Sequence, residues 1–340
     1  MTDADYVDME KSTIVRSSKP SRLLPLFRAG NRALSTLAPA LAARLAERLF
    51  TTPPRSRRPA AEIELLRAAR ARPLQVGGRR IETWVWGAGP TVLLVHGWGG
   101  RGAQLGALVA PLLARGFSVT AFDAPGHGPS AASTVTIPEI TSAIRAVAES
   151  RGPLAAIVAH SAGAAAAVRA LWEGLDAGAV VLVGPAADLV TPALRFSETL
   201  GFSRNVRERM QRRIEARVRR PWSAFDALAL APALTAPLLV IHDRGDAEIP
   251  WQHGASIARA WRGGEMLMTE GLGHRRILRH PDVVAAAVAF VAARSAERGI
   301  AAAVDADPQA RPLEILMAGE RGQGSARTAA RIARSRYRAK

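Results

Sequence analysis

Short apolar runs that alternate with helical patterns are the feature that most constrains the fold of this chain. The run at 91–95 (TVLLV) is apolar throughout, as expected of a strand buried on both faces of a parallel sheet. Helical segments of about ten to fifteen residues between such runs predict right-handed crossovers. We therefore expect an α/β fold with a mostly parallel, twisted sheet flanked by helices. The expected strands are 79–86, 91–95, 117–122, 154–160, 179–183, 237–242 and 265–269, and the expected helices are 60–71, 103–115, 137–150, 164–172, 256–261 and 281–293.

The limits of this alternation predict the domain organisation. Residues 1–59 are expected to form an N-terminal segment that ends in the linker 51–59 (TTPPRSRRP). Residues 60–295 should form the main domain, and an insertion at about 186–236 should form a helical cap over the strand ends. Residues 296–340 are expected to be a basic, flexible tail.

Two amphipathic helices are predicted outside the main alternation. The first covers residues 34–49, with a bend near Pro39. We expect it to dock on the main domain, or alternatively to anchor the protein at a membrane surface, because such anchors combine leucines with arginines. The second, at 203–220, should lie on the main domain and begin at a Ser203 cap. The apolar positions are Leu34, Leu37, Leu41, Leu45 and Leu49 in the first helix and Val206, Met210, Ile214 and Val218 in the second.

The formal net charge of +17 has two interpretations. It can reflect compositional bias, because most basic residues are arginine and alanine is abundant. It can also attract an anionic membrane surface, nucleic acid or substrate. The arginine-rich faces of 203–220 fit a solvated helix or an anion-attracting surface, and both remain open. We predict no nucleic-acid partner and retain peripheral membrane association as an alternative.

The sequence contains no cysteine, which excludes disulfides, thiolate nucleophiles and cysteine-based metal sites. Its first ten residues are acidic and lack the apolar core of a secretory signal. No apolar run reaches bilayer-spanning length, so we expect a cytoplasmic protein. The histidines are scattered without metal-ligand spacing, and we expect neither a metal nor a cofactor.

The stretch 154–172 predicts a strand, a sharp turn and a helix, with Ser161 at the turn. Its motif is Ala159-His160-Ser161-Ala162-Gly163. A serine exposed on a strained strand-to-helix turn, with small neighbours that let the helix pack closely, is a nucleophile elbow. Alanine stands at the first position, where glycine is usual. The motif taken alone also fits an ordinary alanine- and glycine-rich turn.

The Ser161 turn, the Gly97-Trp98-Gly99-Gly100 loop after the strand 91–95, the aspartates after the strand 237–242 and His274 after the strand 265–269 occur in one order along the chain. In these motifs, residues of about 75–295 resemble an α/β-hydrolase of the esterase and lipase kind. The order in that family is serine, acid, histidine, and the resemblance implies that Ser161 is the nucleophile. A serine hydroxyl needs a base to take its proton. His274, in Gly271-Leu-Gly-His274 after the last expected strand, matches the family position, and we expect it to be mobile and exposed. His280 is the competitor, but His280-Pro281 predicts a helix start.

Three acidic residues follow the preceding strand and compete to orient the histidine. The family pattern places the acid three residues before a Val/Ile-Pro pair, which selects Asp246. Asp243 is expected to cap the turn at the strand end, and Glu248 is the third candidate. The acid holds the imidazole tautomer and stabilises its charged form.

The resemblance also implies an oxyanion hole made by two backbone N–H groups. Ala162 follows the nucleophile, and Trp98 lies in the glycine-rich loop His96-Gly97-Trp98-Gly99-Gly100. Those glycines also fit an ordinary turn, whereas a phosphate cradle fits poorly because no P-loop lysine occurs. Asp123 and His127, in DAPGHG, are expected to stabilise the fold and not to catalyse.

We therefore predict a serine hydrolase that cleaves a carboxylic ester of a small-molecule acyl substrate through a Ser161, Asp246 and His274 triad. A thioesterase, a peptidase or a catalytically silent binding protein with the same fold are the alternatives. The acyl group, the alcohol, the substrate-binding residues and the oligomeric state do not follow from the sequence.

Overall fold

The computed structural model describes residues 23–54, 57–128 and 134–298 and contains the mostly parallel sheet that the sequence predicts. Its eight strands lie in the order β1-β4-β6-β5-β7-β8-β9-β10. The six strands from β6 to β10 run parallel, whereas β4 is antiparallel to β6 and β1 is antiparallel to β4. The strands are β1 (Arg70–Ala71), β4 (Thr83–Trp86), β5 (Thr91–Val95), β6 (Ser118–Phe122), β7 (Leu154–His160), β8 (Val180–Val183), β9 (Leu238–Asp243) and β10 (Glu265–Thr269).

Helices cover both faces of the sheet because successive side chains of a strand point to opposite faces. In β5, Leu93 and Val95 belong to one apolar core, while Val92 and Leu94 belong to the other. The first core is closed by α6 (Ile137–Glu149), α7 (Ala162–Trp172) and α11 (Trp251–Ala260). The second is closed by α5 (Val109–Leu113) and α13 (Pro281–Glu297). Strands between two such layers are buried on both faces, which explains their continuous apolar runs.

Three expected elements near the start of the main domain are different in the structure. The expected helix 60–71 ends at Arg67, and its last two residues form β1 at the edge of the sheet. The expected strand 79–86 breaks at Glu82 into β3 (Arg79–Ile81), which forms a hairpin with β2 (Leu74–Val76), and β4, which joins the large sheet. The expected helix 103–115 is a 3₁₀ segment, η2 (Gly102–Leu108), followed by the short α5. A Cβ at Gly102 would lie 2.9 Å from the carbonyl oxygen of Phe122, so this segment begins pressed against β6.

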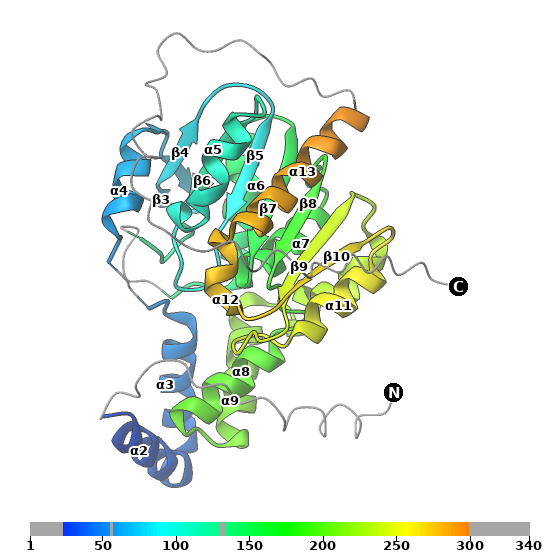
Figure 1. The fold of residues 1–340 in the computed structure, drawn as a ribbon. Helices are drawn as coiled ribbons and strands as arrows, with labels where there is room; N and C mark the ends of the chain where they lie inside the picture. The colour runs from blue at the N-terminus through cyan, green and yellow to red at the C-terminus, as the bar shows by residue number, and fades with distance from the viewer. Residues whose placement is uncertain (1–22, 55–56, 129–133, 299–340) are drawn as a thin grey trace.

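The insertion after β8 forms a cap together with the N-terminal helices (Figure 1). It contains α8 (Val190–Leu200) and α9 (Arg204–Val218), and Ser203 caps α9 as predicted. In the apolar stripe of α9, Val206, Met210 and Ile214 are buried and pack in the cap core with α3 (Pro39–Thr51). Half-buried Val218 packs against both the cap core and the core of the main domain. The expected docking on the main domain therefore holds only at the end of the helix, because the N-terminal segment covers the rest of the stripe.

The expected helix 34–49 is two helices, α2 (Leu24–Leu37) and α3, which are separated at Ala38 (φ −144°, ψ 67°). Proline at the next position cannot donate the hydrogen bond that would continue α2. The break divides the leucines, because Leu34 and Leu45 pack in the cap core while Leu37, Leu41 and Leu49 are exposed. The segment thus docks on the cap, where buried Glu47 accepts hydrogen bonds from Arg213 and Arg217 of α9.

The remaining elements connect these layers. Among the described residues, no helix is both long enough and apolar enough to cross a membrane. Residues 1–22 and 299–340, which include nearly all of the expected tail, lie outside the described part of the chain. The other helices are α4 (Ala60–Arg67), η3 (Trp222–Phe225), α10 (Ala227–Leu230), η4 (Ala231–Ala233), α12 (Gly273–Arg276) and η5 (Ile277–Arg279).

Candidate active site

The sequence-predicted site residues follow the carboxyl ends of neighbouring strands. Trp98 follows β5, Ser161 follows β7, Asp246 follows β9 and His274 follows β10. Gly184 directly follows β8, between the strands that carry the serine and the acid. Because these strands are parallel and adjacent, the fold places all five positions at one edge of the sheet.

Ser161 lies in the strained turn that the sequence predicts. Its φ of 54° and ψ of −122° are unusual for a residue with a side chain and cost about 1–3 kcal/mol. Its N–H donates to the carbonyl of Val183 at 3.0 Å, which ties the turn to the end of β8. A Cβ at Gly163 would lie 2.3 Å from the carbonyl oxygen of His96, and one at Gly97 would lie 2.9 Å from the Cβ of Ser161. The glycines therefore let the first turn of α7 and the loop after β5 approach the serine closely.

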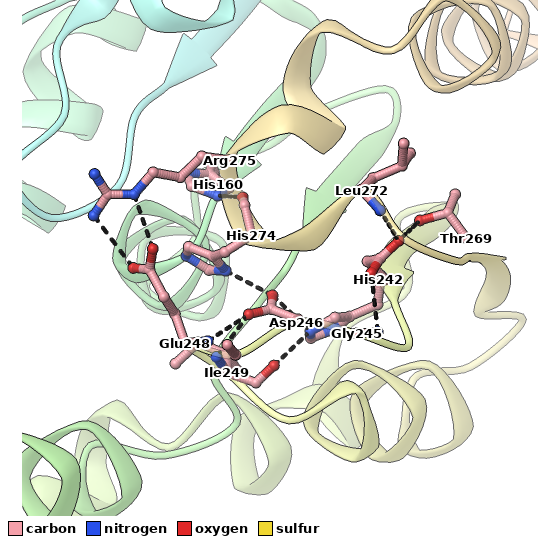
Figure 2. Close-up of polar contacts among 12 residues, drawn as sticks. His160, His242, Gly245, Asp246, Glu248, Ile249, Thr269, Leu272, His274 and Arg275 are labelled. Atoms are coloured by element: carbon pink, nitrogen blue, oxygen red, sulfur yellow. Dashed lines mark hydrogen bonds and ion pairs between the residues drawn. The ribbon is translucent and has the colours of Figure 1, made fainter. Parts of the chain in front are cut away.

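Asp246 and His274 form a buried hydrogen-bonded pair (Figure 2). The Nδ1 atom of His274 lies 2.7 Å from Oδ2 of Asp246, and Oδ1 accepts the N–H groups of Glu248 and Ile249 at 2.8 and 2.9 Å. Burial raises the pKa of the Asp246 carboxyl, but hydrogen bonds from His242 and His274 outweigh burial and lower this pKa well below its usual range. Ionised Asp246 can only accept a hydrogen bond, so a neutral His274 that pairs with it carries its proton on Nδ1. The Nε2 atom of His274 is then free to accept a proton.

His274 is buried, whereas its glycine-bounded loop had led us to expect an exposed side chain. It lies in the one-turn helix α12, and its carbonyl accepts a hydrogen bond from Nε2 of His160 at 2.9 Å. The two imidazole rings are 4.6 Å apart between centroids. The residue before the nucleophile thus contacts the expected base. The competitor His280 stands at the start of α13, as its His-Pro sequence predicts.

The other two acidic candidates have separate partners. Oδ1 of Asp243 accepts the N–H of Gly245 at 2.9 Å, and Oδ2 accepts the N–H of Leu272 at 2.9 Å, which confirms that Asp243 caps the turn. Glu248 forms an exposed ion pair with Arg275 at 2.9 Å. Of the three acids, Asp246 is the one hydrogen-bonded to His274.

Three residues that sequence reasoning passed over help to position this pair. His160 supports α12, and burial together with the neighbouring His274 lowers the pKa of His160 to about 3. Nε2 of His242 donates to the carbonyl of Ile249 at 3.1 Å and lies 3.4 Å from Oδ2 of Asp246. Gly184 has a φ of 55°, and a Cβ there would lie 3.2 Å from the His274 ring. The elbow motif contained a signal for His160, but Gly184 and His242 carried none.

The loop that contains Trp98 is held by a buried network. Nε2 of His96 accepts the N–H of Ala124 at 2.9 Å, and Nε2 of His127 accepts the N–H of Gly99 at 3.1 Å. Asp123 accepts the N–H of Gly102 at 2.8 Å and forms an ion pair with Arg58. These contacts are consistent with structural roles for Asp123 and His127. Burial lowers the pKa values of His96 and His127 to about 4, so both side chains are neutral near pH 7.

Two backbone N–H groups flank the serine on either side of the site. Trp98 lies between Gly97, which contacts Ser161, and the anchored Gly99. Ala162 is the first residue of α7. Within the described residues, no hydrogen-bond acceptor is found for the N–H of Trp98 or of Ala162. In the same part of the chain, no group of three or more histidine, aspartate or glutamate residues is arranged to hold a metal ion.

This chain is similar to known proteins at the level of the family and of the fold. Residues 92–287, more than half of the chain, match the sequence model of the alpha/beta hydrolase family. An esterase from Pyrococcus furiosus is 16% identical with a TM-score of 0.55, and the match covers 71% of this chain and 98% of that one. An esterase from Exiguobacterium antarcticum is 16% identical with a TM-score of 0.52, covering 65% and 99%. The thioesterase domain from the curacin biosynthetic pathway is 17% identical with a TM-score of 0.50, covering 66% and 98%. No curated protein matches the sequence.

Proposed function

The chain belongs to the alpha/beta hydrolase family, and from that premise we propose that it is a serine hydrolase that cleaves carboxylic esters. The observation that carries this proposal is the strained Ser161 elbow beside a buried Asp246–His274 pair. Backbone strain persists only where the surrounding structure enforces it, and it concentrates at functional sites. A structural serine in an ordinary turn would need neither the strain nor the neighbouring pair.

The proposed reaction assigns one role to each group. Nε2 of His274 takes the hydroxyl proton of Ser161 while Oγ attacks the ester carbonyl. The N–H groups of Trp98 and Ala162 hold the oxygen of the tetrahedral intermediate, and each such donor contributes about 2.7–4 kcal/mol. His274 then gives its proton to the departing alcohol, which leaves an acyl group on Ser161. Water, deprotonated by His274, cleaves that acyl-enzyme and restores the serine.

Ionised Asp246 orients His274 and stabilises its charged form during both steps. The low pKa of Asp246 supports this role, because the carboxylate stays ionised when the neighbouring imidazole gains a proton. The N–H groups of Glu248 and Ile249 occupy its other oxygen and fix the plane of the carboxylate. The acid is therefore held in place before substrate binds.

A fluorophosphonate probe tests whether Ser161 is an activated nucleophile. The wild-type protein should be labelled on Ser161, and Ser161→Ala should abolish labelling. An unlabelled but folded wild type would favour a catalytically silent binding protein. Turnover of p-nitrophenyl esters of increasing chain length, beside matched thioesters and peptide anilides, then identifies the acyl bond. Faster turnover of the thioesters or anilides would refute the ester assignment while leaving the serine hydrolase intact.

A further inference from the structure

Helix α2 is amphipathic, but its apolar side faces outward and not toward the protein. Its residues Leu26, Gly30, Ala33 and Leu37 are spaced four, three and four apart, which places them on one side of the helix, and all four are exposed. Leu26 is 75% exposed and Leu37 is 84% exposed. A helix at the surface of a globular protein ordinarily turns this apolar side toward the core.

The side of α2 that faces the cap is held by polar contacts. The side chain of Asn31 is buried and donates to the carbonyl of Leu200 at 2.9 Å. The N–H of Ser203 donates to the hydroxyl of Ser35 at 3.4 Å. Specific polar contacts therefore fix the outward orientation of the leucines, because rotating α2 to bury them would break these bonds.

Each of the two helices has a further exposed apolar side chain. Phe27 of α2 is 61% exposed and Leu41 of α3 is 57% exposed. Figure 1 shows α2 and α3 at the end of the cap remote from the sheet, where they project from the molecule. Exposed large apolar side chains at such a projection mark an interaction site. We call Leu26, Phe27, Leu37 and Leu41 the outer apolar face.

The charges around the outer apolar face are almost all positive. Helices α2 and α3 carry four arginines and a single acidic residue, Glu47. Glu47 is buried and paired with two arginines of α9, so it contributes little negative potential at the surface. Three of the arginines are exposed: Arg32, Arg44 and Arg48.

A groove on the side of α2 that faces the cap contains Arg32 and one further arginine, Arg28. It lies between α2 and the junction of α8 and α9, has a volume of about 390 Å³, and is lined by Arg28 and Arg32 together with Glu198 and the hydroxyls of Ser35 and Ser203. Guanidinium groups bind phosphate oxygens with directed hydrogen bonds. The exposed arginines of α2 and α3 can therefore bind lipid phosphates at the bilayer surface.

We propose that α2 and α3 form a docking surface for an anionic phospholipid bilayer. Apolar side chains flanked by arginines fit the boundary between lipid headgroups and acyl chains. A second copy of this chain fits worse, because a symmetric contact through this face would bring two sets of exposed arginines together. Docking lies beyond the esterase proposal and does not depend on it, since none of these residues belongs to the candidate active site.

Co-sedimentation of the full chain with vesicles tests the proposal. Vesicles of 30% phosphatidylglycerol in phosphatidylcholine should bind the protein, and pure phosphatidylcholine should bind it at least about tenfold more weakly. Raising the salt from 0.1 to 1 M shortens the Debye length from about 10 to 3 Å and should weaken binding to the anionic vesicles at least about tenfold. Leu26→Gln with Leu37→Gln should weaken it by about tenfold for each substitution, whereas the exposed Ile63→Gln on α4 should leave it unchanged.

The arginines are tested separately with a charge-matched control. Replacing Arg32, Arg44 and Arg48 with glutamine should weaken anionic-vesicle binding roughly fivefold for each arginine. The control removes the same charge outside α2 and α3 by replacing three other exposed arginines, Arg115, Arg259 and Arg262, and should change binding less than about threefold. Equal losses in both triple variants would overturn the proposal, because net charge and not this surface would then control binding.

Two further outcomes would overturn the docking surface. One is a folded wild-type protein that fails to bind anionic vesicles at 0.1 M salt. The other is a dimer, measured by sedimentation velocity at micromolar concentration, that Leu26→Gln with Leu37→Gln converts to monomer. The second result would assign the outer apolar face to a second copy. Circular dichroism of each variant verifies folding, and all the substituted side chains are exposed.

Discussion

Replacing Asp246 with asparagine should reverse the tautomer of His274. Oδ1 of Asp246 accepts two backbone N–H groups, those of Glu248 and Ile249. The asparagine oxygen must take that place, because an amide NH₂ there would face two donors and lose about 1–3 kcal/mol for each. The NH₂ group then stands where Oδ2 was, 2.7 Å from Nδ1 of His274.

An NH₂ group in that position donates to Nδ1, so the ring proton of His274 moves to Nε2. An imidazole with a protonated Nε2 cannot accept the proton of Ser161. We expect kcat for a p-nitrophenyl ester to fall roughly 10³- to 10⁴-fold, which corresponds to about 4–5.5 kcal/mol of activation free energy. The fold should survive, because His242 keeps its own bond to the carbonyl of Ile249.

The matched control is Asp243→Asn, which changes an acid three residues away. Both oxygens of Asp243 accept backbone N–H groups, so an amide must leave one donor unsatisfied and should lower the free energy of unfolding by about 1–3 kcal/mol. Its kcat should fall by less than about tenfold. Turnover, thermal unfolding and the ¹⁵N shifts of the His274 ring measure the two variants. A kcat for Asp246→Asn within tenfold of the wild type, with the proton still on Nδ1, would refute the reasoning.

Three other perturbations test the site and the fold. Ser161→Ala and His274→Ala should each abolish ester turnover, and the double variant should be scarcely slower, because the two groups act as a unit; multiplicative losses would contradict the assignment. The free energy of unfolding should fall as the pH drops from about 6.5 toward 4, because three buried histidines bind protons in the unfolded chain but not in the folded one. Each histidine should contribute up to about 1.4 kcal/mol per pH unit. Those histidines are His96, His127 and His160, with pKa values lowered to about 4, 4 and 3. A urea midpoint that is equal at pH 7 and pH 5 would contradict this linkage. Met210→Ala in α9 should cost about 2–5 kcal/mol of unfolding free energy through the cavity left against α3, without loss of kcat, and a neutral result would show that this contact is not formed.

The sequence by itself determined the parallel sheet, the turn at Ser161 and the cap helix that begins after Ser203. These features depend on neighbours in the chain: continuous apolar runs for strands buried on both faces, small residues around a strained turn, and a hydroxyl before a helix. The resemblance to the α/β-hydrolase family also distinguished Asp246 from Asp243, because the family pattern places the acid three residues before a Val/Ile-Pro pair, here Ile249-Pro250. The structure then placed the hydrogen bond to His274 on Asp246.

Only the tertiary structure decided the surroundings of those residues. The burial of His274 arises from contacts with His160, more than a hundred residues earlier in the chain, and with Gly184 on a third strand. The pairing of α3 with α9 likewise joins segments far apart in the sequence, whereas the break at Ala38 follows from the local proline that predicted a bend. A leucine repeat predicts that one side of a helix is apolar, but it cannot say whether that side meets a protein core or faces outward. That choice depends on the polar contacts of Asn31 and Ser35 with the cap, which hold the other side of α2 inward.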